Sequence, residues 1–436
     1  MKRHSTTFVA AAAAAVFLAT GALTSCSSGG TPTAAAGSKT LRVTLANHVW
    51  TETIKSKLSE FEKATGLKVE VSQYGEAQLN DQYNVKLNAN TTDIDVMMYE
   101  PQQTGKLFAK NGWFADLSKD VNSNKDWNWN DFQAGPVEMT TDRGKTVGVP
   151  IVTEQEVLYY RKDLLQKAGL QVPKTMDELQ AAAKAIKEQN PGVAGFVART
   201  DKSAAVSVFA SYLFSFGSDY IDKSGNSGVG SDEAKKAYAF YGGLIRNYGP
   251  DHVSTDMGWP EALAIFSQGK AGLWTDADSL YPNLTDPAKS KVSDKVGFAP
   301  MPAGPAGFKV NNVPAWALGV NASSKNKANA WKFIEWATSA DMTRVMQQAG
   351  ILGARTSVAD DPKAFATFPK GLASAIAAST KKGVGIGHFL PLVINVQKAR
   401  DIVGAPIVTA IKGGDSNAAA DTANTAFQQL IDGEKK

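Results

Sequence analysis

The pattern of apolar and polar positions predicts strands and helices that alternate from residue 41 onward. Residues 41–45 alternate apolar and polar side chains as a half-buried strand does, and residues 67–71 repeat that pattern. Between these two segments, residues 51–65 place apolar side chains at helical spacing, and Gly66 follows as a typical helix end. Because strand–helix–strand units of this length form parallel strands with crossover helices, the pattern predicts an α/β fold.

The same alternation continues to the end of the chain, and it contains no internal repeat. Further strands are predicted at 94–99, 147–150, 157–160, 193–197, 271–275 and 315–320. Further helices are predicted at 162–169, 203–216, 231–248, 259–268 and 327–349, and as broken segments over 365–431. Another helix opens at Thr175, because Glu178 stands three residues later and the pair forms a capping box.

The first 26 residues have the pattern of an export signal. Lys2 and Arg3 precede an apolar run over 8–18, and small residues then lead to Cys26. The sequence Leu-Thr-Ser-Cys resembles the lipobox of bacterial lipoproteins, which implies a signal peptide over 1–25 and a diacylglycerol on Cys26. Residues 26–39 are small and polar, and we expect a flexible tether there. The alternative is an ordinary signal peptide with a chance cysteine.

Composition and charge exclude several functions. The chain has 436 residues, 43% hydrophobic and 20% charged, which is enough for two globular domains. Without Lys2 and Arg3 the balance is 44 basic against 42 acidic residues, a net charge of +2, so no nucleic-acid partner is predicted. Cys26 is the single cysteine, so the rest of the chain has no disulfide and no thiol nucleophile. The segment from Asp222 has the spacing of a calcium loop, but Ser227 stands where that loop needs glycine, and no metal or cofactor is predicted.

Several blocks resemble the carbohydrate-type solute-binding proteins of bacterial ABC importers, the maltose-binding-protein type. The clearest is GVPIVTEQEVLYYRKDL at 148–164, followed by PKTMDEL at 173–179, where Met176 replaces the tryptophan usual in that family. Further matching blocks lie at 61–69, 266–274 and 300–333. The resemblance covers nearly all of residues 40–436. Within the family, the chain is most similar to the sorbitol/mannitol-binding branch, in its N-terminal block and in Gly-Leu-Trp-Thr-Asp at 272–276.

The resemblance implies a two-lobed periplasmic-binding-protein type II fold, with a hinge between the lobes and a ligand in the cleft. The N-terminal lobe is then expected over 40–150 with about 276–325, and the C-terminal lobe over 151–275 with about 326–436. The implied protein is a monomer held by lipid on the outer face of the cell membrane. It captures a sugar or polyol, closes around it, delivers it to the permease subunits of an ABC transporter and performs no chemistry.

Most candidate ligand-binding residues follow predicted strands, since sites in α/β folds lie at the carboxyl ends of strands. These candidates combine flat apolar faces with hydrogen-bonding groups, as a sugar site requires: Asn47, His48, Trp50, Tyr99, Glu100, Trp274, Asp276 and Asp278. Tyr99 also falls where the resemblance implies a ligand-contacting tryptophan. The alternatives are helix caps for the polar residues and core packing for the aromatic ones.

Three further candidates lie elsewhere. Counted without gaps from Pro150, Glu154 falls on a glutamate that in the resembling family lies at the hinge and touches ligand; the alternative is a salt bridge across the hinge. Trp316 follows Pro314 and is either a stacking surface or part of the core. Arg355 lies in a predicted loop, and both ligand contact and a structural role fit it.

Two other functions remain open at this point. A secreted glycoside hydrolase would need paired acids such as Asp276 and Asp278, but residues two apart on a strand point the same way and cannot flank a scissile bond. An adhesin or a sensor partner with the same fold is the second alternative, because a fold does not determine a function.

Overall fold

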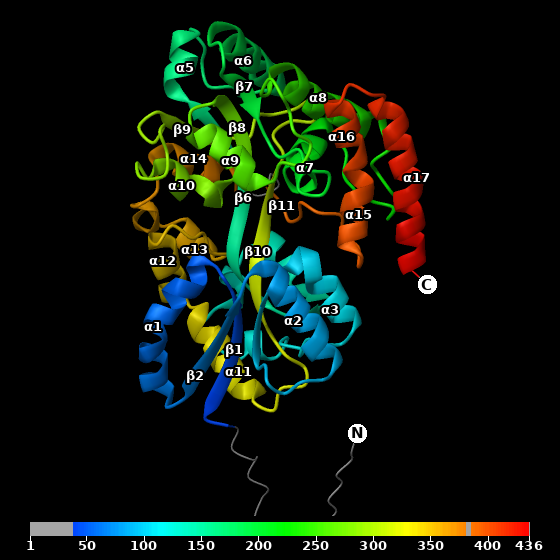
Figure 1. Cartoon of the computed structure of the whole chain (residues 1–436). Helices are drawn as coiled ribbons and strands as arrows, with labels where there is room; N and C mark the ends of the chain where they lie inside the picture. Colours follow the sequence, from blue (N-terminus) through cyan, green and yellow to red (C-terminus); the bar gives the residue numbers. More distant parts are fainter. Residues whose placement is uncertain (1–37, 381–384, 436) are drawn as a thin grey trace, which may run out of the picture. The chain divides into compact units, whose positions relative to one another are not determined.

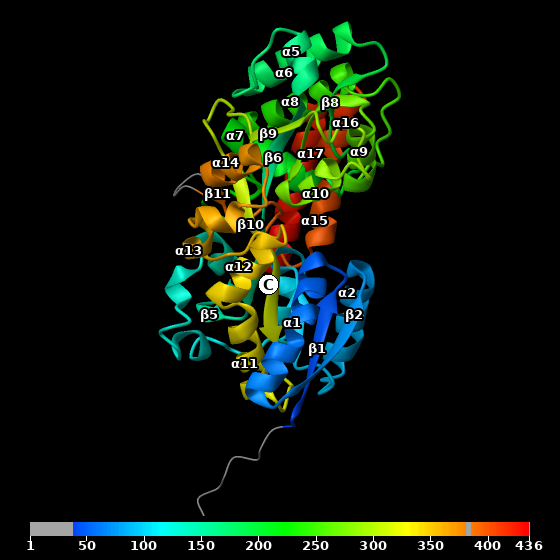
Figure 2. The ribbon, with the colours of Figure 1, turned by 90° about the vertical axis from the view of Figure 1, so that its left-hand side faces the viewer.

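A computed structural model describes residues 38–380 and 385–435, which form two lobes joined by long strands (Figures 1 and 2). The predicted signal peptide and lipidated Cys26 lie outside these residues, as does nearly all of the predicted tether. No helix of the part that the structure describes is long and apolar enough to cross a membrane.

The N-terminal lobe is built on parallel strands with β1 in the centre. Strand β1 (Thr40–Ala46) pairs on one side with β2 (Lys68–Tyr74) and on the other with β3 (Val96–Tyr99). The helices of this lobe are α1 (Val49–Thr65), α2 (Glu76–Asn88), α3 (Lys106–Lys110), α4 (Ala134–Met139), α11 (Lys327–Ala337) and α12 (Ala340–Gln348). Its shorter elements are η1 (Pro101–Gly105), η2 (Asp120–Asn122), η3 (Trp129–Asp131) and the hairpin of β4 (Thr141–Asp142) with β5 (Lys145–Thr146).

Local sequence explains where these helices begin and end. Helix α1 buries Ile54 and Phe61 on one face, and it ends at Gly66, whose φ of 69° is the left-handed conformation that favours glycine. The single helix expected over 327–349 is divided into α11 and α12. The division lies at Ser339, whose hydroxyl accepts a hydrogen bond from the Met342 backbone N–H (3.2 Å) and so caps a new helix.

The C-terminal lobe has a smaller sheet covered by more helices. Strands β7 (Ala194–Val197) and β8 (Ala271–Ala277) are parallel, and β9 (Val296–Pro300) pairs with the connecting strand β6 (Val149–Arg161). The first helices of this lobe are α5 (Lys162–Lys167), α6 (Met176–Gln189), α7 (Ala205–Phe216), α8 (Asp232–Tyr248), α9 (Trp259–Ser267), η4 (Asp278–Leu280) and α10 (Tyr281–Thr285). The last part of the chain adds η5 (Pro362–Phe365), α14 (Lys370–Ser379), β11 (Gly385–Ile386), α15 (Val396–Val403), α16 (Ala405–Ile411) and α17 (Ser416–Glu434).

Two antiparallel strands, β6 (Val149–Arg161) and β10 (Val310–Val320), run through both lobes. Near the start of β6, Val149, Ile151 and Val152 belong to the N-terminal core, and further along residues 157–159 belong to the cores of the C-terminal lobe. Between them lie four polar residues, 153–156 (Thr-Glu-Gln-Glu). Since a strand buried on both faces is normally apolar throughout, this polar interruption marks where the chain passes between the lobes. The chain passes a third time near α13 (Thr356–Ala359), since Ala354 belongs to the N-terminal core and Leu372 to a C-terminal core.

The lobe boundaries differ from those expected. Residues 326–349 do not join the C-terminal lobe, because Phe333 and Met346 belong to the N-terminal core. Conversely, Phe298 packs in a C-terminal core although 276–325 was assigned to the other lobe. The reason is the path of β10: its last residues pair with β3, so the helices that follow it cover the N-terminal sheet. Helical periodicity identifies the buried face of a helix but not the sheet that this face covers.

Candidate functional site

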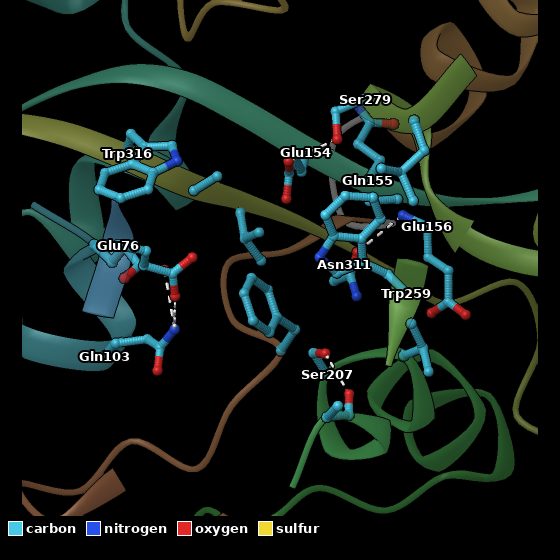
Figure 3. A pocket seen from close by; sticks show the side chains of 18 of the residues that line it. Glu76, Gln103, Glu154, Gln155, Glu156, Ser207, Trp259, Ser279, Asn311 and Trp316 are labelled. Atoms are coloured by element: carbon cyan, nitrogen blue, oxygen red, sulfur yellow. Dashed lines mark hydrogen bonds between the residues drawn. The ribbon is translucent and has the colours of Figure 1, made fainter. Parts of the chain in front are cut away.

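A cavity of about 570 Å³ lies between the lobes, where strand ends from both lobes meet the middle of β6 and β10 (Figure 3). Residues at the carboxyl ends of β1, β2 and β3 line it from the N-terminal lobe, and residues after β7 and β8 line it from the C-terminal lobe. Carboxyl ends of parallel strands are where ligands bind in open α/β sheets. The parallel topology of the two sheets therefore explains why the cavity lies at these strand ends.

Five of the eleven residues predicted to bind ligand line the cavity: Asn47, His48, Glu100, Glu154 and Trp316. His48 also caps α1, since its Nδ1 accepts a hydrogen bond from the Trp50 backbone N–H (3.0 Å). Burial lowers the pKa of His48 to about 4, so the ring is neutral near pH 7. Its centroid lies 6.1 Å from that of Trp316.

Three aromatic candidates lie in the cores instead. Trp50 packs on the buried face of α1, and Trp274 stacks on Tyr159 with centroids 4.8 Å apart. The Tyr99 ring packs against Phe114 at 4.6 Å. The expectation that these three face the cavity is wrong, because a position near a strand end does not determine the face to which the side chain points.

Two acidic candidates are buried beside the cavity and hold other groups. Asp276 accepts hydrogen bonds from the Arg199 guanidinium, with Nε at 3.0 Å, and is fully buried. Asp278 accepts from the Gln155 backbone N–H (3.2 Å) and lines a smaller neighbouring cavity of about 70 Å³. Burial raises the pKa of Asp278 well above its usual range. Neither carboxylate lines the main cavity, which corrects their expected positions.

Arg355 is likewise structural. Its guanidinium donates to Asp131 (2.9 Å) and to the carbonyls of Trp127 (2.7 Å) and Thr338 (2.8 Å). It also lies 4.2 Å above the centroid of Phe132. With 1% of its surface exposed and no position on the cavity wall, Arg355 fastens η3 to the end of α11.

Sequence reasoning missed the other lining residues with charged, amide or indole side chains: Glu76, Gln103, Gln155, Glu156, Arg199, Trp259, Asn311 and Arg400. Glu76 and Arg199 follow β2 and β7 closely. The rule that sites in α/β folds lie at the carboxyl ends of strands, here called the strand-end rule, would therefore have found both. Gln155 and Glu156 adjoin the predicted Glu154. Arg400 and Trp259 lie on helices, and nothing in their local sequence distinguishes them.

At one end of the cavity, hydrogen bonds connect the two lobes. Gln103 Nε2 donates to Glu100 Oε1 (2.9 Å) and to Glu76 Oε1 (3.4 Å), while Arg400 Nη1 donates to Gln103 Oε1 (3.2 Å). Arg400 belongs to α15 of the C-terminal lobe, so this chain of contacts spans the cavity. Burial, followed by repulsion from Glu76, raises the pKa of Glu100 to about 8.

The middle of β6 forms another wall. Glu154 Oε1 accepts a hydrogen bond from the Ser279 hydroxyl (2.7 Å), and the Glu156 backbone N–H donates to Asn311 Oδ1 (3.0 Å). Burial raises the pKa of both carboxyl groups. Burial acts to lower the pKa of Arg199, but attraction to Asp276 and Glu154 outweighs it and the pKa is raised.

Apolar faces complete the cavity. Trp316 and Phe389 line it, and so do Val49 and Trp259, which are 58% and 44% exposed. Exposed large apolar side chains that gather at a concave polar surface are typical of ligand sites. Among the described residues no cluster of three His, Asp or Glu side chains could hold a metal ion. The arrangement suits non-covalent binding of a small molecule with both hydroxyl groups and C–H faces.

Comparison with known proteins decides the family. Residues 47–344 match the sequence profile of the bacterial extracellular solute-binding proteins. The chain belongs to this family. The predicted resemblance is therefore confirmed, and the protein is a member of a solute-binding family found outside the bacterial cytoplasm.

Curated relatives of this solute-binding protein include two polyol-binding proteins. It is 30% identical over 253 residues to the mannitol-binding protein of Pseudomonas aeruginosa, and the match spans 56% of each chain. It is 26% identical over 336 residues to the erythritol/L-threitol-binding protein of Mycolicibacterium smegmatis, spanning 72% of this chain and 70% of the other. The chain thus spans little more than half the length of the mannitol-binding relative.

Solved structures confirm the predicted two-lobed fold. A solute-binding protein of Agrobacterium radiobacter K84 in complex with ribitol matches with a TM-score of 0.76 and 26% identity, over 90% of this chain and 98% of the other. Maltose-bound T. maritima MalE3 matches with a TM-score of 0.76 and 29% identity, over 89% of this chain and all (100%) of the other.

Proposed function

We propose that this solute-binding protein captures a sugar or polyol in the interlobe cavity and delivers it to the permease of an ABC transporter. One observation carries the proposal: carboxylates, amides and indoles from both lobes and from the connecting strands converge on a single cavity. Carboxylates and amides accept hydrogen bonds from hydroxyl groups, and indole faces pack on C–H groups. Relatives named for binding mannitol or erythritol, and structures holding ribitol or maltose, support this ligand class.

The distribution of the wall between two lobes supports a mechanism in which closure traps the ligand. A ligand that contacts both lobes stabilises the closed form by its greater affinity for that form, and the permease can then distinguish loaded from empty protein. One chain supplies the whole wall, so we propose that the protein acts as a monomer.

The arrangement of acids favours binding over hydrolysis. Glu154 and Glu156 lie two residues apart on β6, and strand residues at that spacing point to the same side. A glycosidase needs two carboxyl groups on opposite sides of the bond that it breaks, and the carboxyl groups across the cavity, Glu76 and Glu100, are both held by hydrogen bonds from Gln103 Nε2. We therefore propose that the protein is not an enzyme.

A thermal-shift screen against sugars and polyols tests the proposed function. A ligand at about 100 times its dissociation constant stabilises the native state by about 2.7 kcal/mol, which raises the melting temperature by several degrees. Chromogenic glycosides, followed for release of the dye, serve as the enzymatic arm. A panel of sugars, sugar alcohols and oligosaccharides that leaves the melting temperature unchanged at millimolar concentrations would contradict the proposal, as would turnover above background.

We also propose that lipid on Cys26 tethers the protein to the outer face of the cell membrane. A receptor without an anchor would diffuse away from its permease, and the small and polar segment 27–39 is long enough to serve as a flexible tether. Replacing Cys26 by Ser is expected to release the protein into the soluble fraction with unchanged ligand affinity, as followed by fractionation and immunoblotting. Retention of Cys26→Ser in the membrane fraction would count against the anchor.

A further inference from the structure

The loop between β11 and α15 forms part of the boundary between the lobes, and its residues 387–392 are here called the strap. Two of its side chains are fastened to the C-terminal lobe. His388 Nε2 lies 3.0 Å from Asp219 Oδ1, and its ring packs edge-on against Phe214 with centroids 5.3 Å apart. Leu390 is fully buried in the C-terminal core. The strap therefore belongs to the C-terminal lobe.

The backbone of the strap, in contrast, is bound by the N-terminal lobe. Gln102 of η1 accepts hydrogen bonds on Oε1 from two consecutive backbone N–H groups, those of Phe389 (2.8 Å) and Leu390 (3.3 Å). Lys106 Nζ, at the start of α3, donates to the Leu392 carbonyl (2.5 Å). These hydrogen bonds cross from one lobe to the other, so they exist only while the lobes are together at this edge.

Two glycines allow the lobes to approach this closely. A Cβ added at Gly135, in α4 of the N-terminal lobe, would lie 3.3 Å from the Cα of Gly387 in the strap. A Cβ added at Gly387 would lie 3.1 Å from the Gly135 carbonyl oxygen. Because any larger residue at either position would push the two backbones apart, the contact between strap and N-terminal lobe is a close backbone contact.

The Gln102 amide is the central contact of this boundary. It has 6% of its surface exposed, and the strap determines its orientation, because the reverse orientation would set Nε2 against two N–H donors. A buried backbone N–H without an acceptor is unfavourable, whereas one exposed to water is not. The two hydrogen bonds therefore stabilise the arrangement with the lobes together more than one with the lobes apart.

Phe389 connects these hydrogen bonds to the ligand site. Its side chain lines the cavity, and its own backbone N–H is one of the two that Gln102 accepts. Close to Gln102 in sequence, Glu100 and Gln103 also line the cavity, and Gln103 accepts from Arg400 of the C-terminal lobe (3.2 Å). One short segment of the N-terminal lobe thus supplies both cavity wall and hydrogen bonds between the lobes.

We propose that Gln102 is a positioning residue, which holds the strap so that the lobes stay closed over the ligand and the Phe389 ring stays on the cavity wall. Gln102 does not itself line the cavity, so it acts on the ligand through the strap. Ligand capture and lobe closure then stabilise each other, since both need the same arrangement of the strap. The expected effect on affinity rests on the proposed function, whereas the effect on the lobes does not.

Three substitutions test the role of the amide. Gln102→Met keeps the length of the side chain and removes the accepting oxygen, and Gln102→Glu keeps an accepting oxygen. Asn321→Leu is the control, because Asn321 Nδ2 donates to the Thr91 and Ile94 carbonyls (2.8 and 2.9 Å) within the N-terminal lobe. Its loss should lower stability while leaving the lobe separation and the affinity unchanged.

Energy transfer between two fluorophores measures the lobe separation, with and without ligand. The fluorophores are attached through Lys63→Cys in α1 and Glu188→Cys in α6, which are exposed positions in different lobes (Figure 1). The background is Cys26→Ser, which removes the single native thiol. Calorimetry with D-mannitol, ribitol and maltose as probes measures affinity.

We expect Gln102→Met to shift the population toward larger lobe separation and to weaken binding of the probe by about 10-fold, as loss of an acceptor for buried N–H groups allows. Gln102→Glu should stay within about threefold of the unchanged protein in affinity and should keep its lobe separation. Lys106→Met is a second variant that leaves the fold intact, because the Lys106 side chain is exposed. It should increase the lobe separation by a smaller amount.

The outcomes decide the inference separately from the proposed function. Unchanged energy transfer in both Gln102→Met and Lys106→Met overturns it, even where affinity falls. It is also overturned if Gln102→Glu is as impaired as Gln102→Met, or if Asn321→Leu separates the lobes as much. If no sugar or polyol binds the unchanged protein, the proposed function fails, and the energy transfer of the ligand-free variants still decides whether Gln102 holds the lobes together.

Discussion

Replacing Arg355 by Met is expected to destabilise the protein by about 3–5 kcal/mol, as removal of one partner from a buried ion pair does. The guanidinium has 1% of its surface exposed and donates to Asp131 at 2.9 Å. Its loss would leave the Asp131 carboxylate and the carbonyls of Trp127 and Thr338 without their donor. Met fills much of the space but supplies no hydrogen bond.

Urea unfolding followed by circular dichroism measures this effect. Arg344→Met is the matched control, because Arg344 is 37% exposed and its ion pairs with Asp341 and Asp361 lie at the surface. We expect that control to change the free energy of unfolding by less than about 1 kcal/mol. A similarly small effect of Arg355→Met would contradict the structural role.

Replacing Trp316 by Ala is expected to weaken ligand binding by about 10- to 100-fold, a loss of about 1.5–3 kcal/mol. Trp316 lines the cavity beside His48 while 8% of its surface is exposed, so its indole offers a rigid face for C–H groups of the ligand. This prediction rests on the proposed function. Calorimetry with a ligand from the thermal-shift screen measures the change.

Trp336→Ala is the control for loss of an indole from the same lobe. Trp336 packs against Phe61 with centroids 5.0 Å apart and does not line the cavity. That variant should lose stability but keep its affinity. Binding by Trp316→Ala within about threefold of the unchanged protein would show that the indole does not contact ligand.

Sequence patterns located β1, β2, β3, β7 and β8, because strand periodicity and helix caps are local, but they missed β9 and divided β6 into two strands. The capping box of Thr175 with Glu178 is present, with the Glu178 backbone N–H 3.2 Å from the Thr175 hydroxyl. The assignment of later segments to lobes was less accurate. Helices α11 and α12 cover the N-terminal sheet because β10 ends there, and that path depends on pairing between residues far apart in sequence.

The strand-end rule had a similar limit at the site. It placed His48 and Glu100 on the cavity wall, and it also selected Trp50 and Tyr99, whose side chains point into the core. The rule locates a backbone position, whereas the direction of the side chain depends on the twist of the sheet and on the helices packed against it.

The sequence alone determined the α/β class, the order of the strands along the chain and the family, because these follow from local periodicity and from contiguous motifs. Only the tertiary structure decided which polar groups share the cavity. Arg400 donates a hydrogen bond to Gln103, which lies 297 residues away in the sequence. Asp276 accepts hydrogen bonds from Arg199, which lies 77 residues away. Whether a charge is free for a ligand therefore depends on partners brought close by folding, and no local pattern records them.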